Sequence, residues 1–188
     1  QEMLGFSFWV MIRSIAMFLS NKADRLILAA YFSPTIIGLY TIAGELATMA
    51  VFELLNPIGR TLLPALAKKQ NDPQWLAENI PKIFNITATL AIASGVGIAA
   101  IATPILALVY GWQYTSASSM LVLLAILNAI AGFNQPIGQI LLLMNRAKEF
   151  AMLYIFEGIS TVALIYYLST NNYDIETIIY GRLAISAL

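Results

Sequence analysis

The sequence predicts an all-α protein, a polytopic helix bundle that crosses a membrane several times. Hydrophobic residues make up 60% of the 188-residue chain and charged residues only 11%, against about 45–50% and about 25% in soluble domains. No charged residue lies between Lys82 and Arg146, and so long an uncharged stretch does not make a soluble surface. We expect five complete transmembrane helices and a truncated sixth in a single transmembrane domain, residues 1–188.

The first helix is expected at about residues 5–32, because its apolar run alone is too short to cross a bilayer. Residues 5–19 rise only about 22 Å at 1.5 Å per residue, whereas the hydrocarbon core is about 30 Å thick. The crossing must therefore continue through the polar segment that holds Lys22, Asp24 and Arg25. These three charges then lie inside or near the membrane.

Polar turns and prolines separate the remaining helices. Ser33–Pro34 precedes the second helix, and a polar loop from Lys68 to Pro73 follows it. Thr103–Pro104 is expected to end the third helix, with a short helix at 105–110 after it. These signals delimit helices at about residues 35–67, 74–102, 115–144, 150–168 and 175–188.

The distribution of basic residues predicts the orientation. Lys68 and Lys69 follow the second helix, and Arg146 and Lys148 follow the fourth. Basic loops are retained in the cytoplasm, so both ends of the six-helix unit are expected there. The chain begins at Gln1 without an initiating Met and ends in an apolar stretch. We therefore expect it to be a piece of a larger membrane protein.

The composition argues against an enzyme. The chain has no cysteine and no histidine, which excludes thiol and imidazole catalysis and most catalytic zinc sites. We expect no catalytic residue, no metal site and no bound cofactor. A net charge of zero and the lack of a glycine-rich phosphate loop give no indication of nucleic-acid binding.

Charged residues at membrane depth are the main functional signal, because they are costly there and face a bundle interior or water. Arg13 and Asp24 fall on one face of the first helix with Met17 and Ser20 between them, and we expect this face to line a cavity. Lys22 and Arg25 project elsewhere, so snorkelling to the interface is an alternative for them.

Three further charges lie on the second helix. Glu53 and Arg60 share a face seven residues apart, and Glu45 points about 80° away from Glu53. Structural roles stay open for these charges and for those on the first helix. Arg13 would then be an interfacial anchor, Asp24 and Arg25 would pair with neighbouring helices, and Glu53 and Arg60 would neutralise each other.

Short motifs in a fixed order carry a family resemblance. Asp24-Arg25-Leu26-Ile27-Leu28 is followed by Ser33-Pro34, Gly38-Leu39-Tyr40-Thr41-Ile42-Ala43, Asn56-Pro57-Ile58-Gly59 and Leu63-Pro64-Ala65-Leu66-Ala67. Later come Leu108-Val109-Tyr110-Gly111, Gly138-Gln139-Ile140-Leu141 and Asn145-Arg146-Ala147-Lys148. The chain resembles the second half of a polysaccharide or O-antigen flippase of the multidrug/oligosaccharidyl-lipid/polysaccharide exporter superfamily.

The resemblance implies a function and a set of site residues. Such proteins have two six-helix lobes, and they move an undecaprenyl-diphosphate-linked oligosaccharide across the bacterial inner membrane by alternating access. The product serves O-antigen, lipopolysaccharide or exopolysaccharide biosynthesis. The partners would be the bilayer, the lipid-linked oligosaccharide and an N-terminal six-helix half. Arg13, Lys22, Arg25 and Arg60 would attract the anion, and Asp24, Glu45 and Glu53 would take up a coupling H⁺ or Na⁺.

Other readings stay open from the sequence. A cation-coupled drug antiporter or a peptidoglycan-precursor flippase of the same superfamily would share the fold and differ in cargo. A membrane glycan polymerase would instead need a long loop with clustered catalytic residues.

Overall fold

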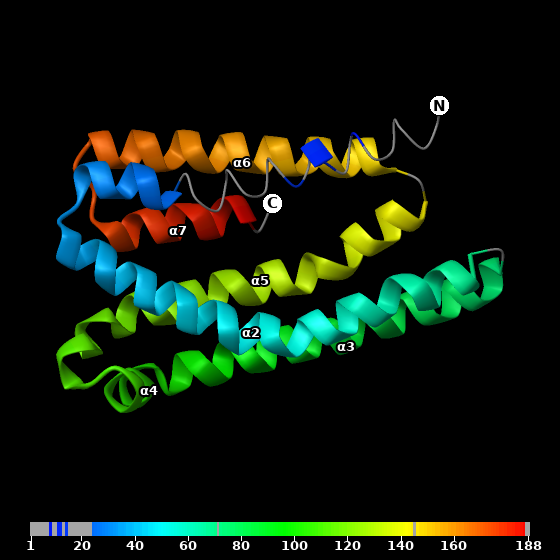
Figure 1. The fold of residues 1–188 in the computed structure, drawn as a ribbon, viewed down its shortest axis with the longest axis horizontal. Helices are drawn as coiled ribbons and strands as arrows, with labels where there is room; N and C mark the ends of the chain where they lie inside the picture. Colours follow the sequence, from blue (N-terminus) through cyan, green and yellow to red (C-terminus); the bar gives the residue numbers. More distant parts are fainter. Residues whose placement is uncertain are drawn as a thin grey trace. The chain divides into compact units, whose positions relative to one another are not determined.

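A computed structural model describes residues 8, 11, 12, 14, 24–70, 72–144 and 146–186 of the chain (Figure 1). Across these ranges every residue is helical or lies in a turn, bend or short connection, and none is in a strand. Within the described ranges, four helices are long and apolar enough to cross a membrane. The prediction of an all-α membrane helix bundle is therefore confirmed.

The helices lie close to the expected ranges. Residues 24–31 are helical, and the rest of the expected first span (5–32) lies largely outside the described residues. The elements that follow are α2 (Pro34–Lys68), α3 (Pro73–Ala100), α4 (Ala102–Val109), the 3₁₀ helix η1 (Trp112–Ala117), α5 (Ser118–Leu143), α6 (Ala147–Thr170) and α7 (Ile175–Ser186). The four candidate spans are Pro34–Lys68, Pro73–Ala100, Trp112–Leu143 and Lys148–Thr170.

The third helix ends earlier than expected. The break falls at Ile101, and Thr103 and Pro104 lie inside the first turn of α4. A proline is tolerated there because N–H groups in the first turn have no partner within the helix. At the other end of α3, Asp72 caps the helix by accepting the Trp75 N–H at 3.0 Å.

Two turns depend on unusual backbone conformations. Gly111, between α4 and η1, has a φ of 101°, a region that residues with a Cβ rarely adopt. Asn172, in the turn between α6 and α7, has a φ of 57°, which asparagine tolerates better than most residues.

The chain divides into two compact units, residues 38–140 and residues 1–37 with 141–188. Within residues 38–140, Val51 and Leu55 of α2 form a buried core with Ala91 of α3. Gly132 of α5 lies against this core, where an added Cβ would meet Leu55 Cδ1 at 2.6 Å. Small residues let helix backbones approach closely in a membrane, so the absence of a side chain here permits the close packing.

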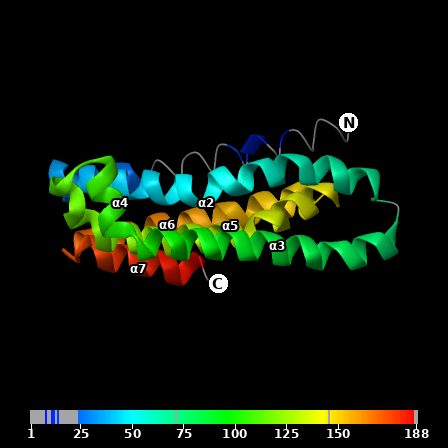
Figure 2. The same cartoon turned by 90° about the horizontal axis from the view of Figure 1, so that it is seen from below.

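In the other unit, α6 and α7 form an antiparallel hairpin and lie side by side in both views (Figure 1, Figure 2). Gly181 of α7 faces α6, where an added Cβ would lie 2.8 Å from Leu164 Cδ2. The helical segment 24–31 joins this hairpin through Tyr31, whose ring meets the ring of Tyr166 edge-on at 6.4 Å between centroids. The Tyr31–Tyr166 contact and the α6–α7 turn mark one end of this unit.

Candidate functional site

A pair of opposite charges lies inside the unit formed by residues 24–31, α6 and α7. Asp24 precedes Tyr31 by seven residues in one helical segment, and Arg182 follows the first residue of α7 by seven. Seven residues of helix rise about 10 Å. Both side chains therefore start about 10 Å from the end marked by Tyr31 and the α6–α7 turn.

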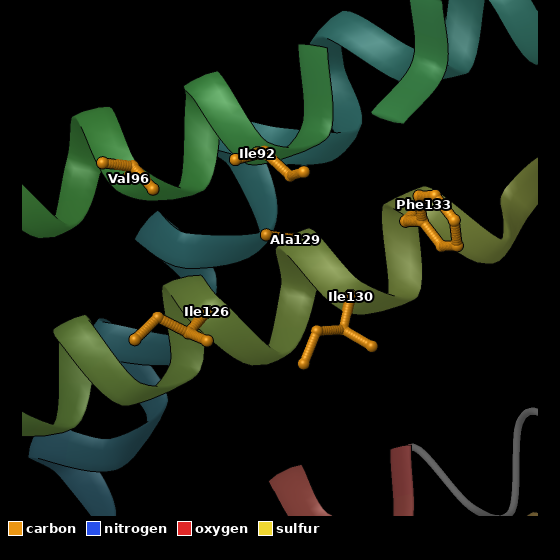
Figure 3. Close-up of a pocket in the computed structure, with 6 residues that line it drawn as sticks. All are labelled: Ile92, Val96, Ile126, Ala129, Ile130 and Phe133. Atoms are coloured by element: carbon orange, nitrogen blue, oxygen red, sulfur yellow. The ribbon is translucent and has the colours of Figure 1, made fainter. Parts of the chain in front are cut away.

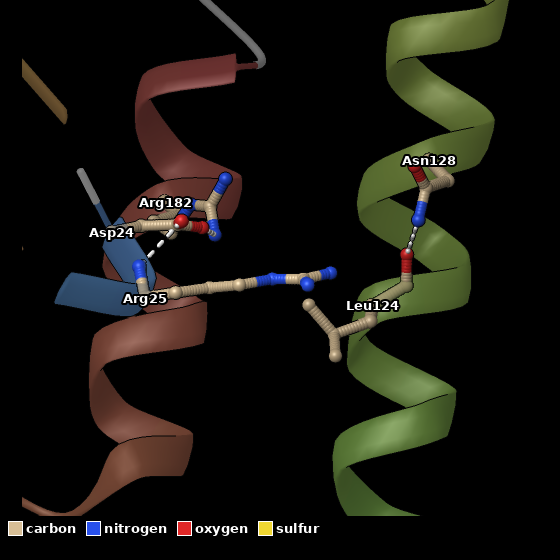
Figure 4. A network of polar contacts seen from close by, with 5 residues as sticks. All are labelled: Asp24, Arg25, Leu124, Asn128 and Arg182. Carbon is tan, nitrogen blue, oxygen red and sulfur yellow. Dashed lines mark hydrogen bonds and ion pairs between the residues drawn. The ribbon is translucent and has the colours of Figure 1, made fainter. Parts of the chain in front are cut away.

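The contact between them is short and largely buried. Arg182 Nη1 donates to Asp24 Oδ2 at 2.7 Å, and the side chains are 18% and 8% exposed respectively (Figure 4). The second carboxylate oxygen, Oδ1, accepts the backbone N–H of Arg25 at 2.6 Å. The Asp24 carboxylate is thus held by the Arg182 guanidinium of α7 and by the backbone N–H of the next residue, Arg25.

A buried pair of this kind constrains the packing strongly. Each charge alone would cost several kcal/mol in an apolar interior, and removing one partner leaves the other uncompensated. The structural alternative for Asp24, pairing with a neighbouring helix, is therefore what the structure shows. Whether Asp24 also couples an ion is a separate matter that stays a prediction.

Arg25 differs from its neighbour. Its side chain leaves the helix in another direction and is half-buried (Figure 4). None of the ion pairs within the described ranges includes Arg25. Among the described residues, two cations, Arg25 and Arg182, thus accompany the anion Asp24.

The sequence interpretation missed Arg182, although a signal was present. Arg182 is a single charge within the apolar run from Ile178 to Leu188. The rule that selected Asp24 and Arg25, charge at membrane depth, selects Arg182 equally. What the sequence lacked was any sign that Arg182 faces Asp24.

The structure places Glu45, Glu53 and Arg60 on α2 and leaves all three exposed. It does not bring Glu53 and Arg60 into an ion pair, and in the part of α2 that is described Glu45 joins none either. Gly59, next to Arg60, is buried, and an added Cβ there would lie 3.1 Å from Gln135 Nε2 of α5. Arg13 and Lys22 lie outside the described residues.

An apolar groove lies between α3 and α5. Its volume is about 230 Å³, and its lining consists of Ile92, Val96, Ile126, Ala129, Ile130 and Phe133 (Figure 3). None of these side chains can bind an anion or a sugar hydroxyl through a hydrogen bond. The groove therefore offers hydrocarbon contact alone and is not the candidate polar site.

Polar side chains on the long helices bond mainly to their own helix. The Asn128 amide donates to the Leu124 carbonyl one turn earlier on α5 at 2.9 Å (Figure 4), and Thr87 donates to the Ile83 carbonyl on α3 at 2.9 Å. Among the described residues, no group of three or more acidic side chains is gathered in a way that could hold a metal ion.

Comparison with known proteins identifies a family whose members this chain resembles. The family described as "polysaccharide biosynthesis protein" matches residues 1–119. The lipopolysaccharide biosynthesis protein WzxC of Escherichia coli K12 is 28% identical over 145 residues, covering 77% of this chain and 29% of that protein. These matches agree with the resemblance carried by the short motifs.

Two further relatives come from other bacteria. An uncharacterized membrane protein in the cps region of Klebsiella pneumoniae is 28% identical over 171 residues, 90% of this chain and 35% of that protein. The teichuronic acid biosynthesis protein TuaB of Bacillus subtilis 168 is 21% identical over 129 residues, 69% and 27% respectively. The chain thus spans about a third of the length of these relatives, and no solved structure matches it.

Proposed function

The chain belongs to the polysaccharide biosynthesis protein family, and from this premise we propose that it is part of a flippase. The cargo is a lipid-linked oligosaccharide, carried across the bacterial inner membrane by alternating access. The chain is a multi-pass bacterial membrane protein, as its composition predicts. To the family membership and the membrane location, the proposal adds three points, which are the transport activity, the lipid-diphosphate substrate and a non-enzymatic role.

The observation that carries the proposal is the group of charges in the unit of α6 and α7. Asp24, Arg25 and Arg182 lie about 10 Å from the end of apolar helices, two of them in a largely buried ion pair. Charge at that depth requires a functional or structural compensation. A diphosphate and a hydrophilic glycan cannot cross hydrocarbon unaided, so a transporter for them needs polar, preferably cationic groups along its path.

The roles of the individual residues follow from their chemistry. Guanidinium groups bind phosphate oxygens through two parallel N–H donors, which suits Arg25, Arg60 and Arg13 to the anionic headgroup, with Lys22 as a point charge. Carboxylates take up H⁺ or Na⁺, which suits Asp24, Glu45 and Glu53 to ion coupling. Arg60, Glu45 and Glu53 are exposed on α2, so the packing of the described residues does not bury them.

The proposal is tested by complementation of a strain that lacks its own flippase, using the full-length protein. The variants Arg25→Gln and Arg60→Gln each remove one cation. We expect each to lower surface polysaccharide by about tenfold or more at unchanged protein level, because a hydrogen bond to a charged group contributes about 1.5–3 kcal/mol.

The matched control is Arg146→Gln. Arg146 is exposed at the start of α6 and pairs with Glu149 at 3.4 Å, and Lys68, Lys69 and Lys148 keep the basic loops basic after its loss. Surface polysaccharide should stay at the wild-type level. If Arg25→Gln and Arg60→Gln also leave polysaccharide unchanged, the anion-binding roles are wrong. If the wild-type protein changes drug sensitivity and restores no polysaccharide, a drug antiporter replaces the flippase.

A further inference from the structure

We propose that Arg182 is an anion-binding residue of the transport path and that Asp24 is its internal counter-ion. The proposal rests on the flippase function above and adds one site to it. The ligand group is a phosphate oxyanion, such as the diphosphate of a lipid-linked sugar. Asp24 neutralises Arg182 while the site is empty, and the incoming phosphate competes with the Asp24 carboxylate for the same guanidinium.

The exposed fractions favour the cation as the member of the pair that meets a ligand. The Asp24 side chain is 8% exposed and that of Arg182 is 18% exposed. Both oxygens of Asp24 are already engaged, one by Arg182 Nη1 and the other by the Arg25 N–H. An approaching group therefore reaches the guanidinium more readily than the carboxylate.

The balance of charge points the same way. Arg25 and Arg182 carry two positive charges and Asp24 one negative charge, so these three described residues together carry one net positive charge. In an apolar environment a net charge on such a group is costly. An anionic ligand would remove that excess, whereas a second cation would increase it.

The depth of the Asp24–Arg182 pair in the membrane indicates at which stage of transport Arg182 would bind the headgroup. Within this unit the pair lies near the α6–α7 turn, and Arg146 and Lys148 lie at the opposite end of α6. Basic turns face the cytoplasm, so the pair lies on the side away from it. Arg182 is then suited to hold the headgroup after it has crossed, before release into the outer leaflet.

The test uses the purified full-length protein and farnesyl diphosphate as a short prenyl diphosphate probe, with farnesol as the uncharged comparison. Arg182→Gln should weaken binding of farnesyl diphosphate about ten- to a hundredfold and leave farnesol binding unchanged. Arg182→Lys, which keeps the charge but loses the fork of donors, should fall between the two.

Asp24→Asn should act in the opposite direction. Without the competing carboxylate, farnesyl diphosphate should bind severalfold tighter than to wild type. It should also raise the unfolding temperature of this variant by more than that of wild type, because its phosphate replaces the negative charge that Arg182 has lost with the Asp24 carboxylate. A purely structural pair predicts no gain in affinity.

The double variant Asp24→Asn with Arg182→Gln separates folding from binding. It removes both charges of the pair together, so its level in the membrane should recover relative to Arg182→Gln, while diphosphate binding stays weak. Wild-type affinity in the double variant would show that the pair is structural only and would overturn this inference alone. If wild-type protein binds farnesyl diphosphate no better than farnesol, both this inference and the proposed substrate are wrong.

Discussion

Gly95 of α3 lies close to rigid atoms of α5, and this close approach predicts a large effect for a single added methyl group. In Gly95→Ala the new Cβ would lie 2.7 Å from Ala129 Cβ and 2.9 Å from the Ala125 carbonyl oxygen. Favourable contacts between carbon atoms lie at about 3.5–4.0 Å, so α3 and α5 would have to separate by roughly 1 Å. Neither opposing atom is the end of a flexible side chain, and rotation of a neighbour cannot relieve the clash.

The expected magnitude follows from two opposing effects. Overpacking of this kind costs about 1–3 kcal/mol, and replacing glycine by alanine in a helix returns about 1 kcal/mol. The matched control is Gly97→Ala on the same helix, where an added Cβ meets nothing within 4 Å. The helix-propensity gain cancels between the two variants, so Gly95→Ala should be less stable than Gly97→Ala by about 1–3 kcal/mol.

The measurement is the free energy of unfolding of each variant of the purified protein in detergent. The second variant that isolates the contact is Gly95→Ala combined with Ala129→Gly, which removes the nearer of the two opposing atoms and should recover part of the loss. Equal stability of Gly95→Ala and Gly97→Ala would refute the inferred packing of α3 on α5.

Three further substitutions test separate features by the same unfolding measurement. Leu55 is fully buried in the core with Val51 and Ala91, so Leu55→Ala should lower the free energy of unfolding by about 2–5 kcal/mol. Its exposed neighbour Leu54 is the control, and an equal loss in Leu54→Ala would contradict the core assignment. Asp72→Ala removes the cap of α3 and should lower the free energy of unfolding by about 1 kcal/mol. Asp72→Asn keeps an acceptor for the Trp75 N–H and should lower it less, and equal losses in the two variants would show that the cap does not stabilise the protein. Gly111→Ala places a Cβ on a backbone with a φ of 101° and should lower the free energy of unfolding by about 1–3 kcal/mol. The control Gly38→Ala, with nothing within 4 Å of the new Cβ, should be neutral or stabilising. A neutral Gly111→Ala would argue against the positive φ of this turn.

Much of the fold could be predicted because membrane helices are specified by local composition. The apolar runs and polar turns located α2, α3, α5 and α6 near their observed ranges. The misplaced break at Thr103–Pro104 has a local cause as well. Proline is compatible with a first helical turn, so its presence alone does not say whether a helix ends or begins there.

The candidate site could be predicted only in part. The cost of charge in hydrocarbon singled out Asp24 and Arg25 from the sequence, yet the same reasoning passed over Arg182. It also suggested that Glu53 and Arg60 compensate each other on one helix face, and the structure does not bring them together. Spacing along one helix defines a shared face, but it does not say which side chains meet.

The sequence by itself determined the class of the protein, its helices and the residues at which charge enters the membrane, because these depend on the composition of about 20 residues at a time. Only the tertiary structure decided that Asp24 pairs with Arg182, 158 residues further along the chain, and that Gly95 lies against Ala129. Both contacts join helices that are not consecutive in the chain. The partner of each residue is set by how whole helices pack, and no local pattern records that choice.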